Sequence, residues 1–499
     1  MGEEIGTEDF SDDDHRRFAE RCREGLEALS RLVARPGFGD GPPSAGVEVE
    51  IGLVDKDCRP AFVNREVQAA ANDPDLDVEL DRFNLELNTP PVPLAGRPLT
   101  AMHDALAAGL DRVTRAAATV GARPITIGIL PTLRREDLGL RAMTDSPRFR
   151  ALQKGLRDLR GGPFEIGIDG DEPLLLDWDD ITLEGAATGL HVHLRTPPSA
   201  FAAVFNAAQA AVAPVLAVSA NSPILLEHLL WAETRIALFG QAIDDRAPIG
   251  AAWLPSRASF GHGWIASPVE PFAESVALHV PILPVVGEEA PLDALAEGRI
   301  PGLDELRLHH GTVWRWNRAV VDLGDDPHLR IEMRALPAGP TVSDMTANAA
   351  FLLGLTLALA PQMGWICRSF PFDFARRNFY SAARDGLDAT LLWPSREAPS
   401  PRPYGAVELV RRLLPVARAG LTGMGVEEAD AERWLAVIAE RAESRLTGAA
   451  WQKRELARLE GRERVDALAT MTEIYLRKAV RTPRPAGETA AKATQERTS

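Results

Sequence analysis

Four short runs of this chain alternate apolar side chains with polar side chains of a particular kind. The runs are residues 47–55, 83–88, 189–194 and 329–335. Successive side chains of an extended strand point to opposite faces, so each run would present one apolar face and one polar face. We therefore expect a sheet whose apolar face covers a core and whose other face gathers the polar groups.

The polar faces have an unusual composition for a solvated sheet, which usually favours Thr, Lys, Gln and Arg. They carry Glu48, Glu50, Asn84, Glu86, Asn88, His191, His193, Arg330, Glu332 and Arg334. Glutamates brought together without cations would repel one another. Carboxylate oxygens with one or two imidazoles suit Mg²⁺ or Mn²⁺, and no cysteine lies near these runs to favour structural zinc. Any one run could be an ordinary sheet with a wet face, but the set favours a metal site.

The composition excludes several classes of protein. With 499 residues, 45% hydrophobic and 25% charged, the chain is neither disordered nor fibrous. Its 71 acidic residues outnumber 55 basic ones, and the formal net charge of −16 opposes binding to nucleic acid or anionic lipid. We expect small-molecule substrates, with no nucleic-acid or membrane partner.

Cysteine and lysine usage adds two constraints. Cys22, Cys58 and Cys367 are too few for a disulfide framework, which favours a reducing cytoplasm. The N-terminus has no apolar signal core, and polar residues interrupt the long uncharged stretches, so secretion and membrane spanning are not expected. No lysine lies in a P-loop sequence, so any nucleotide phosphates would be neutralised by arginine and metal.

The pattern along the chain predicts four regions. They are an acidic N-terminal segment and helix (1–44), an α+β catalytic domain (45–395), a helical C-terminal region (396–480) and a disordered tail (481–499). Apolar spacing predicts helices at 15–34, 99–120, 199–218, 223–243, 341–360, 406–420, 426–446 and 450–479. Asn221 would cap the helix at 223–243.

Six ordered segments carry a family resemblance. They are residues 46–55, 85–91, 188–193, 216–223, 330–334 and 378–387. Together they resemble the carboxylate–amine ligase family, which includes the bacterial glutamate–cysteine ligases of the second type, a branch of the glutamine-synthetase-like superfamily. The resemblance covers roughly residues 45–390.

This resemblance implies a fold and a set of residue roles. The fold is a curved, mainly antiparallel sheet with helices packed on its convex face, and its concave face holds Mg²⁺, ATP and an amino-acid substrate. The implied metal ligands are Glu48, Glu50, Glu86, His191 and Glu332. Arg334 and Glu332 are implied as catalytic, with Arg235, Arg330, Arg334 and Arg384 on phosphate. His193, Asn88 and Asn221 are implied as substrate contacts.

The resemblance further implies an ATP-dependent ligase that forms an amide bond through an acyl phosphate, often on the γ-carboxylate of glutamate. Residues 224–230 differ from the better-known members, and 246–330 align with none. The amine substrate, cysteine included, therefore stays open.

Two other functions stay open beside the ligase. One is a metal-dependent hydrolase using His191 and His193 with acids at 177–180. The other is a homologue that binds nucleotide without turnover. A homo-oligomer is likewise open, since neither charge nor spacing decides it.

Overall fold

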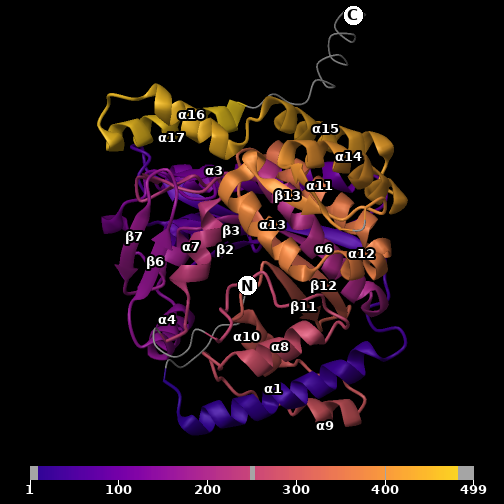
Figure 1. Ribbon diagram of the computed structural model, residues 1–499. Helices are drawn as coiled ribbons and strands as arrows, with labels where there is room; N and C mark the ends of the chain where they lie inside the picture. The colour runs from indigo at the N-terminus through magenta and orange to yellow at the C-terminus, as the bar shows by residue number, and fades with distance from the viewer. Residues whose placement is uncertain (1–8, 248–252, 399, 482–499) are drawn as a thin grey trace, which may run out of the picture.

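An antiparallel sheet forms the centre of the computed structural model, which describes residues 9–247, 253–398 and 400–481 (Figure 1). The sheet has eight strands in the order β11-β12-β8-β1-β3-β2, and β4 and β5 also pair with β1. These strands are β1 (Ser44–Val54), β2 (Leu76–Val78), β3 (Asn84–Asn88), β4 (Val92–Pro93), β5 (Arg123–Ile125), β8 (Gly189–Arg195), β11 (Asn317–Asp322) and β12 (His328–Pro337). Every pairing is antiparallel, as the sequence predicts.

The four alternating runs form four neighbouring strands, β12, β8, β1 and β3. Their apolar residues are almost fully buried, including Val49 and Ile51 of β1 and Val192 of β8. The period-two pattern therefore predicted both the strands and the face that each one buries.

Helices cover the apolar face. The main ones are α3 (Pro98–Thr119), α6 (Pro198–Ser219) and α11 (Val342–Leu359), which contact β1, β12 and β8 respectively. Two helical stretches, Pro198–Ser219 and Val342–Ser369, are long and apolar enough to cross a membrane, yet 89% and 56% of their apolar windows are buried inside the protein. A sheet with one covered face and helices behind it confirms the expected α+β fold.

Other helices surround this core. In the lower part of Figure 1, α1 (Asp12–Val33) packs on α8 (Glu270–Leu278), α9 (Pro291–Ala296) and α10 (Asp304–Gly311). On the far side of α11 lie α14 (Ala406–Gly423) and α15 (Glu428–Ser444). The remaining elements are α2 (Asn64–Ala71), α4 (Pro147–Arg160), α5 (Thr182–Gly185), α12 (Met363–Ser369), α13 (Phe372–Asp385) and two hairpins, β6 (Phe164–Ile168) with β7 (Leu174–Trp178) and β13 (Thr390–Trp393) with β14 (Arg402–Gly405).

Two of the predicted helices are wrong in part. The first half of 223–243 is a small hairpin of β9 (Ile224–Leu225) and β10 (His228–Leu229), and helix α7 begins only at Thr234 (Thr234–Ala242). Leu226 and Glu227 turn this hairpin with φ of 46° and 71°, a conformation usually marked by Asn or Gly. Since neither residue type is present, the leucine spacing suggested a helix instead.

The predicted helix at 450–479 is two helices, α16 (Gly448–Arg458) and α17 (Arg464–Arg481). Gly461, with φ of 90°, lies in the turn between them and lets the two helices pack on each other. Apart from Arg481, the tail predicted at 481–499 lies outside the described residues, as does the start of the acidic segment, residues 1–8.

Candidate active site

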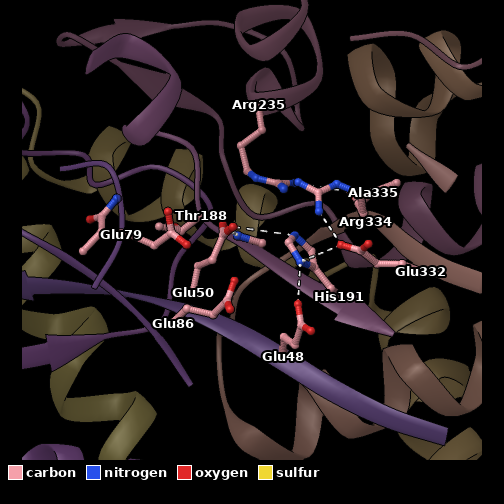
Figure 2. Close-up of polar contacts among 12 residues, drawn as sticks. Glu48, Glu50, Glu79, Glu86, Thr188, His191, Arg235, Glu332, Arg334 and Ala335 are labelled. Atoms are coloured by element: carbon pink, nitrogen blue, oxygen red, sulfur yellow. Dashed lines mark hydrogen bonds and ion pairs between the residues drawn. The ribbon is translucent and has the colours of Figure 1, made fainter. Parts of the chain in front are cut away.

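The pairing of the strands brings the polar residues into one cavity of about 280 Å³. Glu48 of β1 lies opposite His191 of β8, and Glu50 lies opposite Glu86 of β3. Glu332 of β12 lies opposite His193 of β8. Residues up to about 280 positions apart in sequence thus share one polar face because of strand register alone (Figure 2).

His191 lies in the middle of three carboxylates. Its Nδ1 is 3.3 Å from Oε2 of Glu48 and 3.6 Å from Oε1 of Glu332, and its Nε2 is 3.6 Å from Oε1 of Glu50. Two sets of donor atoms result, Glu48 with His191 and Glu332, and Glu50 with Glu86 and His191; within each set the atoms lie within 4.8 Å of one another. Oxygen-rich sets at this spacing fit hard divalent cations such as Mg²⁺ or Mn²⁺.

Two more buried glutamates extend this acidic group, and the sequence analysis missed both. Glu79 follows β2 and Glu184 lies on the short helix α5, and both line the cavity beside Glu50 and Glu86. Glu79 does continue an alternation, Leu76-Asp-Val-Glu-Leu80, so the same pattern would have found it. Glu184 has no such signal, because a four-residue helix shows no periodicity.

Burial and mutual repulsion shift the pKa values of this acidic group upward. Burial, followed by repulsion from Glu48, raises the pKa of Glu86 to about 7. Burial and Glu50 raise the pKa of Glu184 to about 8, and burial with Glu86 and Glu50 raises the pKa of Glu79 well above its ordinary value. For Glu86 and Glu184, burial and neighbouring carboxylates outweigh the attraction of His191 and Arg334, and a bound cation would stabilise the ionised forms.

Glu48 and Glu332 differ, because protein cations compensate them. Burial alone would raise both pKa values, but His193 and His191 hold the pKa of Glu48 well below its ordinary value. Arg318 and Arg334 likewise lower the pKa of Glu332, with Nε of Arg318 2.5 Å from Oε2 and Arg334 paired to Oε1. Arg318 was not predicted, although it alternates with apolar residues along β11.

Arg235 reaches this group from helix α7 (Figure 2). The side chain is buried, with 4% of its surface exposed, and its Nη1 pairs with Glu233 at 3.1 Å and donates to the carbonyl of Ala335, next to Arg334. A Cβ on Gly189 would lie 2.8 Å from Nη2 of Arg235 and 3.1 Å from Nε2 of His191. Only glycine therefore lets Arg235 approach the histidine so closely.

Three remaining candidates, at the cavity or next to it, form ion pairs or hydrogen bonds with neighbouring polar groups. His193 Nε2 lies 2.8 Å from Oε1 of Glu48, and Arg330, also a cavity residue, pairs with Asp322 at 3.1 Å. Asn88 donates to Glu86 at 3.3 Å from the edge of the same face.

Four of the predicted contacts do not line the cavity. Arg235 and Asn88 lie next to residues that do line it, whereas Arg384 and Asn221 are committed elsewhere. Arg384 is 54% exposed and pairs with Asp169 on the surface. Asn221 is fully buried, caps no helix and bonds to Glu233, Ala338, Tyr475 and Gln452. Its bonding groups are therefore taken up by the protein, and the geometry does not support the predicted substrate contact.

The acids that the hydrolase alternative needs do not join the histidines. Asp177 and Asp179 are exposed, and Asp180 accepts hydrogen bonds from Trp178 and Thr182. None of the three lines the cavity that holds His191 and His193. These three acids therefore do not form a hydrolytic site with His191 and His193.

Comparison with known proteins agrees with this geometry. Residues 44–471 match the model of the "Glutamate-cysteine ligase family 2 (GCS2)". A protein of Rubrobacter xylanophilus named "Putative glutamate--cysteine ligase 2-3" is 28% identical over 393 residues, covering 76% of this chain and 86% of that protein.

Two solved structures share the fold. The glutamate–cysteine ligase of Francisella tularensis in complex with AMP superposes with a TM-score of 0.56 at 12% identity, over 91% of this chain and 92% of that one. A bifunctional glutathione synthetase of Pasteurella multocida gives a TM-score of 0.50 at 12% identity, over 91% of this chain and 53% of that one. With the family match over most of its length, the chain belongs to glutamate–cysteine ligase family 2 and is an ATP-dependent amide-forming ligase.

Proposed function

We propose that the chain joins the γ-carboxylate of glutamate to an amine in the cytoplasm, using ATP and Mg²⁺. The observation that carries the proposal is one cavity lined both by the carboxylates of the two donor sets and by Arg318, Arg330 and Arg334. A triphosphate needs cations and arginines, and divalent cations need carboxylates, so the two groups are complementary around a phosphoryl group.

In this proposal the two donor sets form two metal-binding sites. Glu48, His191 and Glu332 form one, and Glu50 and Glu86, extended by Glu79, form the other. When bound there, Mg²⁺ would neutralise phosphate oxygens and polarise the phosphoryl group for attack. The raised pKa values of Glu79 and Glu86 support a cation at the second site, because a cation is what would stabilise their ionised forms.

In this proposal two arginines bind the phosphoryl group, Arg334 in the cavity lining and Arg235 beside His191. Arg334 is oriented by its ion pair with Glu332, and Arg235 by its pair with Glu233. Charge builds up on the phosphoryl oxygens during transfer, and preorganised guanidinium groups stabilise it without having to reorient.

The proposed reaction has two steps, formation of an acyl phosphate and its attack by the amine. A carboxylate oxygen of glutamate attacks the γ-phosphorus of ATP, and the bond to the ADP oxygen breaks. The amine nitrogen then attacks the acyl carbon, loses a proton, and inorganic phosphate leaves. The chain binds and orients the groups, and no covalent nucleophile from the protein is required.

A phosphate-release assay tests this proposal. The purified chain with ATP and Mg²⁺ would be given glutamate alone, glutamate with cysteine, and glutamate with other amines. We expect phosphate and ADP to form in equal amounts, with a new amide seen by mass spectrometry, only when glutamate and an amine are both present. ADP formation unaffected by glutamate would contradict the proposal.

A further inference from the structure

A buried hydrogen-bond network links the C-terminal helices α16 and α17 to Arg235. Gln452 of α16 donates to Oδ1 of Asn221 at 2.9 Å and to its carbonyl at 3.1 Å. Tyr475 of α17 accepts from Nδ2 of Asn221 at 2.9 Å and donates to the carbonyl of Thr126 at 2.8 Å. Both helices thus place a polar side chain on the same asparagine, far from their own solvent-facing sides.

The network continues from Asn221 to the site through Glu233. The backbone N–H of Asn221 donates to Oε2 of Glu233 at 2.8 Å, and the hydroxyl of Ser222 donates to Oε1 at 2.8 Å. Arg235 pairs with that same Oε1. Asn221, Ser222 and Glu233 have no exposed surface, so water cannot take over any of these bonds.

Close packing leaves this network little freedom to shift. A Cβ on Gly448, at the start of α16, would lie 2.1 Å from Oδ1 of Asn221. One on Gly128 would lie 3.0 Å from Cδ of Arg235. Asn221 also donates to Ala338 just past β12, while Arg235 donates to Ala335 within β12. The network is therefore hydrogen-bonded at two points to β12, which carries Glu332 and Arg334, or to the residue just after it.

We infer that α16 and α17 form a positioning element of the phosphoryl-binding site, with Gln452 and Tyr475 fixing Asn221, and Glu233 fixing Arg235 beside His191. The inference rests on the proposed function, because it gives Arg235 a phosphoryl group to meet. Tyr475 lies beyond residues 44–471 that match the family model. Neither C-terminal helix contributes a residue to the active-site cavity, so they would affect catalysis through positioning alone.

The test compares Tyr475→Phe with Leu468→Ala. The first variant removes only the hydroxyl. The second lies on the same helix, in a small apolar cluster with Ile224, Leu456 and Met471, and its hydrocarbon side chain forms none of the network's hydrogen bonds. We expect Tyr475→Phe to lower kcat about 10- to 100-fold with KM for glutamate changed less than about twofold. Leu468→Ala should keep kcat within about threefold while losing more in melting temperature.

Hydrogen exchange gives a second readout that does not need catalysis. The amides of Asn221 and Arg235 donate to side chains of the network, at 2.8 Å and 3.3 Å. They should exchange faster in Tyr475→Phe than in wild type, and at the wild-type rate in Leu468→Ala.

The outcomes separate this inference from the proposed function. Unchanged exchange at these two amides in Tyr475→Phe would overturn the inference, as would a kcat loss that follows melting temperature across both variants. Wild-type protein without ATP turnover would overturn the proposed function, while the exchange comparison would still decide whether Tyr475 positions the segment that holds Arg235.

Discussion

The cavity has two acidic halves that differ in how their charge is balanced. In the first half, Glu48 and Glu332 are held ionised by imidazoles and guanidinium groups, and their pKa values are lowered. In the second half, Glu79, Glu86 and Glu184 face one another and Glu50, and their pKa values are raised. Both halves are buried, so the difference comes from their neighbours.

One half of the polar face is therefore preorganised by ion pairs within the protein, whereas the other half still needs a cation. The first half is ordered by interactions within the protein, since Arg318 and Arg334 form ion pairs with the two carboxylate oxygens of Glu332. In the second half, burial and mutual repulsion outweigh the attraction of His191 and Arg334, so protonation or a bound cation would stabilise its carboxylates. We therefore expect cations to stabilise the second half most.

Breaking the first half should have the largest effect. Glu332→Gln leaves the half-buried Arg318 and Arg334 without their carboxylate, so we expect a loss of about 3 kcal/mol in the free energy of unfolding. ATP turnover should fall about 10²- to 10³-fold or more. Urea titration and phosphate release measure the two losses.

A control for this variant is Asp326→Asn, near the turn of the same hairpin. It breaks an exposed pair with Arg195 and should change stability by less than about 1 kcal/mol. Wild-type turnover in Glu332→Gln would remove the first half from the mechanism.

The second half should make stability depend on pH when cations are absent. The folded pKa of Glu184 is raised from 4.5 to about 8, so the folded state holds a proton that the unfolded chain has released. Stability should therefore fall as pH rises from about 4.5 to 8, by up to about 5 kcal/mol. Urea unfolding in EDTA measures the fall, and Mg²⁺ should reduce it. A profile that is flat in EDTA would contradict the account of this half.

The junction between the halves is sensitive to one added methyl group. Gly189→Ala would place a Cβ against Arg235 and His191, and its backbone N–H donates to Glu50. We expect kcat to fall about tenfold with the fold retained. Gly263→Ala is the matched control, because no atom lies within 4 Å of its added Cβ. Equal activity of the two variants would show that the contact tolerates displacement.

The smallest effect is expected outside both halves. Arg384→Ala removes an exposed arginine that pairs with Asp169, so kcat/KM should stay within about twofold of wild type. A large loss of turnover would return Arg384 to the phosphate-binding residues that the sequence suggested.

Much of the fold was predictable because its signals are local. Alternation with a period of two marked β1, β3, β8 and β12, and apolar spacing marked α3, α6 and α11 nearly to the residue. The hairpin at 224–229 was not predictable, because Leu226 and Glu227 adopt positive φ without a turn sequence. Tertiary contacts overrode the helical pattern there.

The site was predictable where its residues lie on strands. The pattern identified the six ligand-type residues that the register brings together, whereas Glu184 comes from one turn of helix and was missed. Arg235 was named only through the family resemblance, because its position depends on its buried partner Glu233. Asn221 shows the opposite case, since its motif predicted a ligand contact while the hydrogen bonds described for it all go to the protein. Partners that distant in sequence leave no local pattern.

Counting bound cations tests the central claim most directly. Mn²⁺ would be titrated into the chain with a non-hydrolysable ATP analogue and followed by electron paramagnetic resonance, for wild type, Glu332→Gln and Glu86→Gln. The two donor sets predict two tightly bound Mn²⁺ per wild-type chain and one fewer in each variant. Binding of the same number of ions by all three proteins would contradict the account.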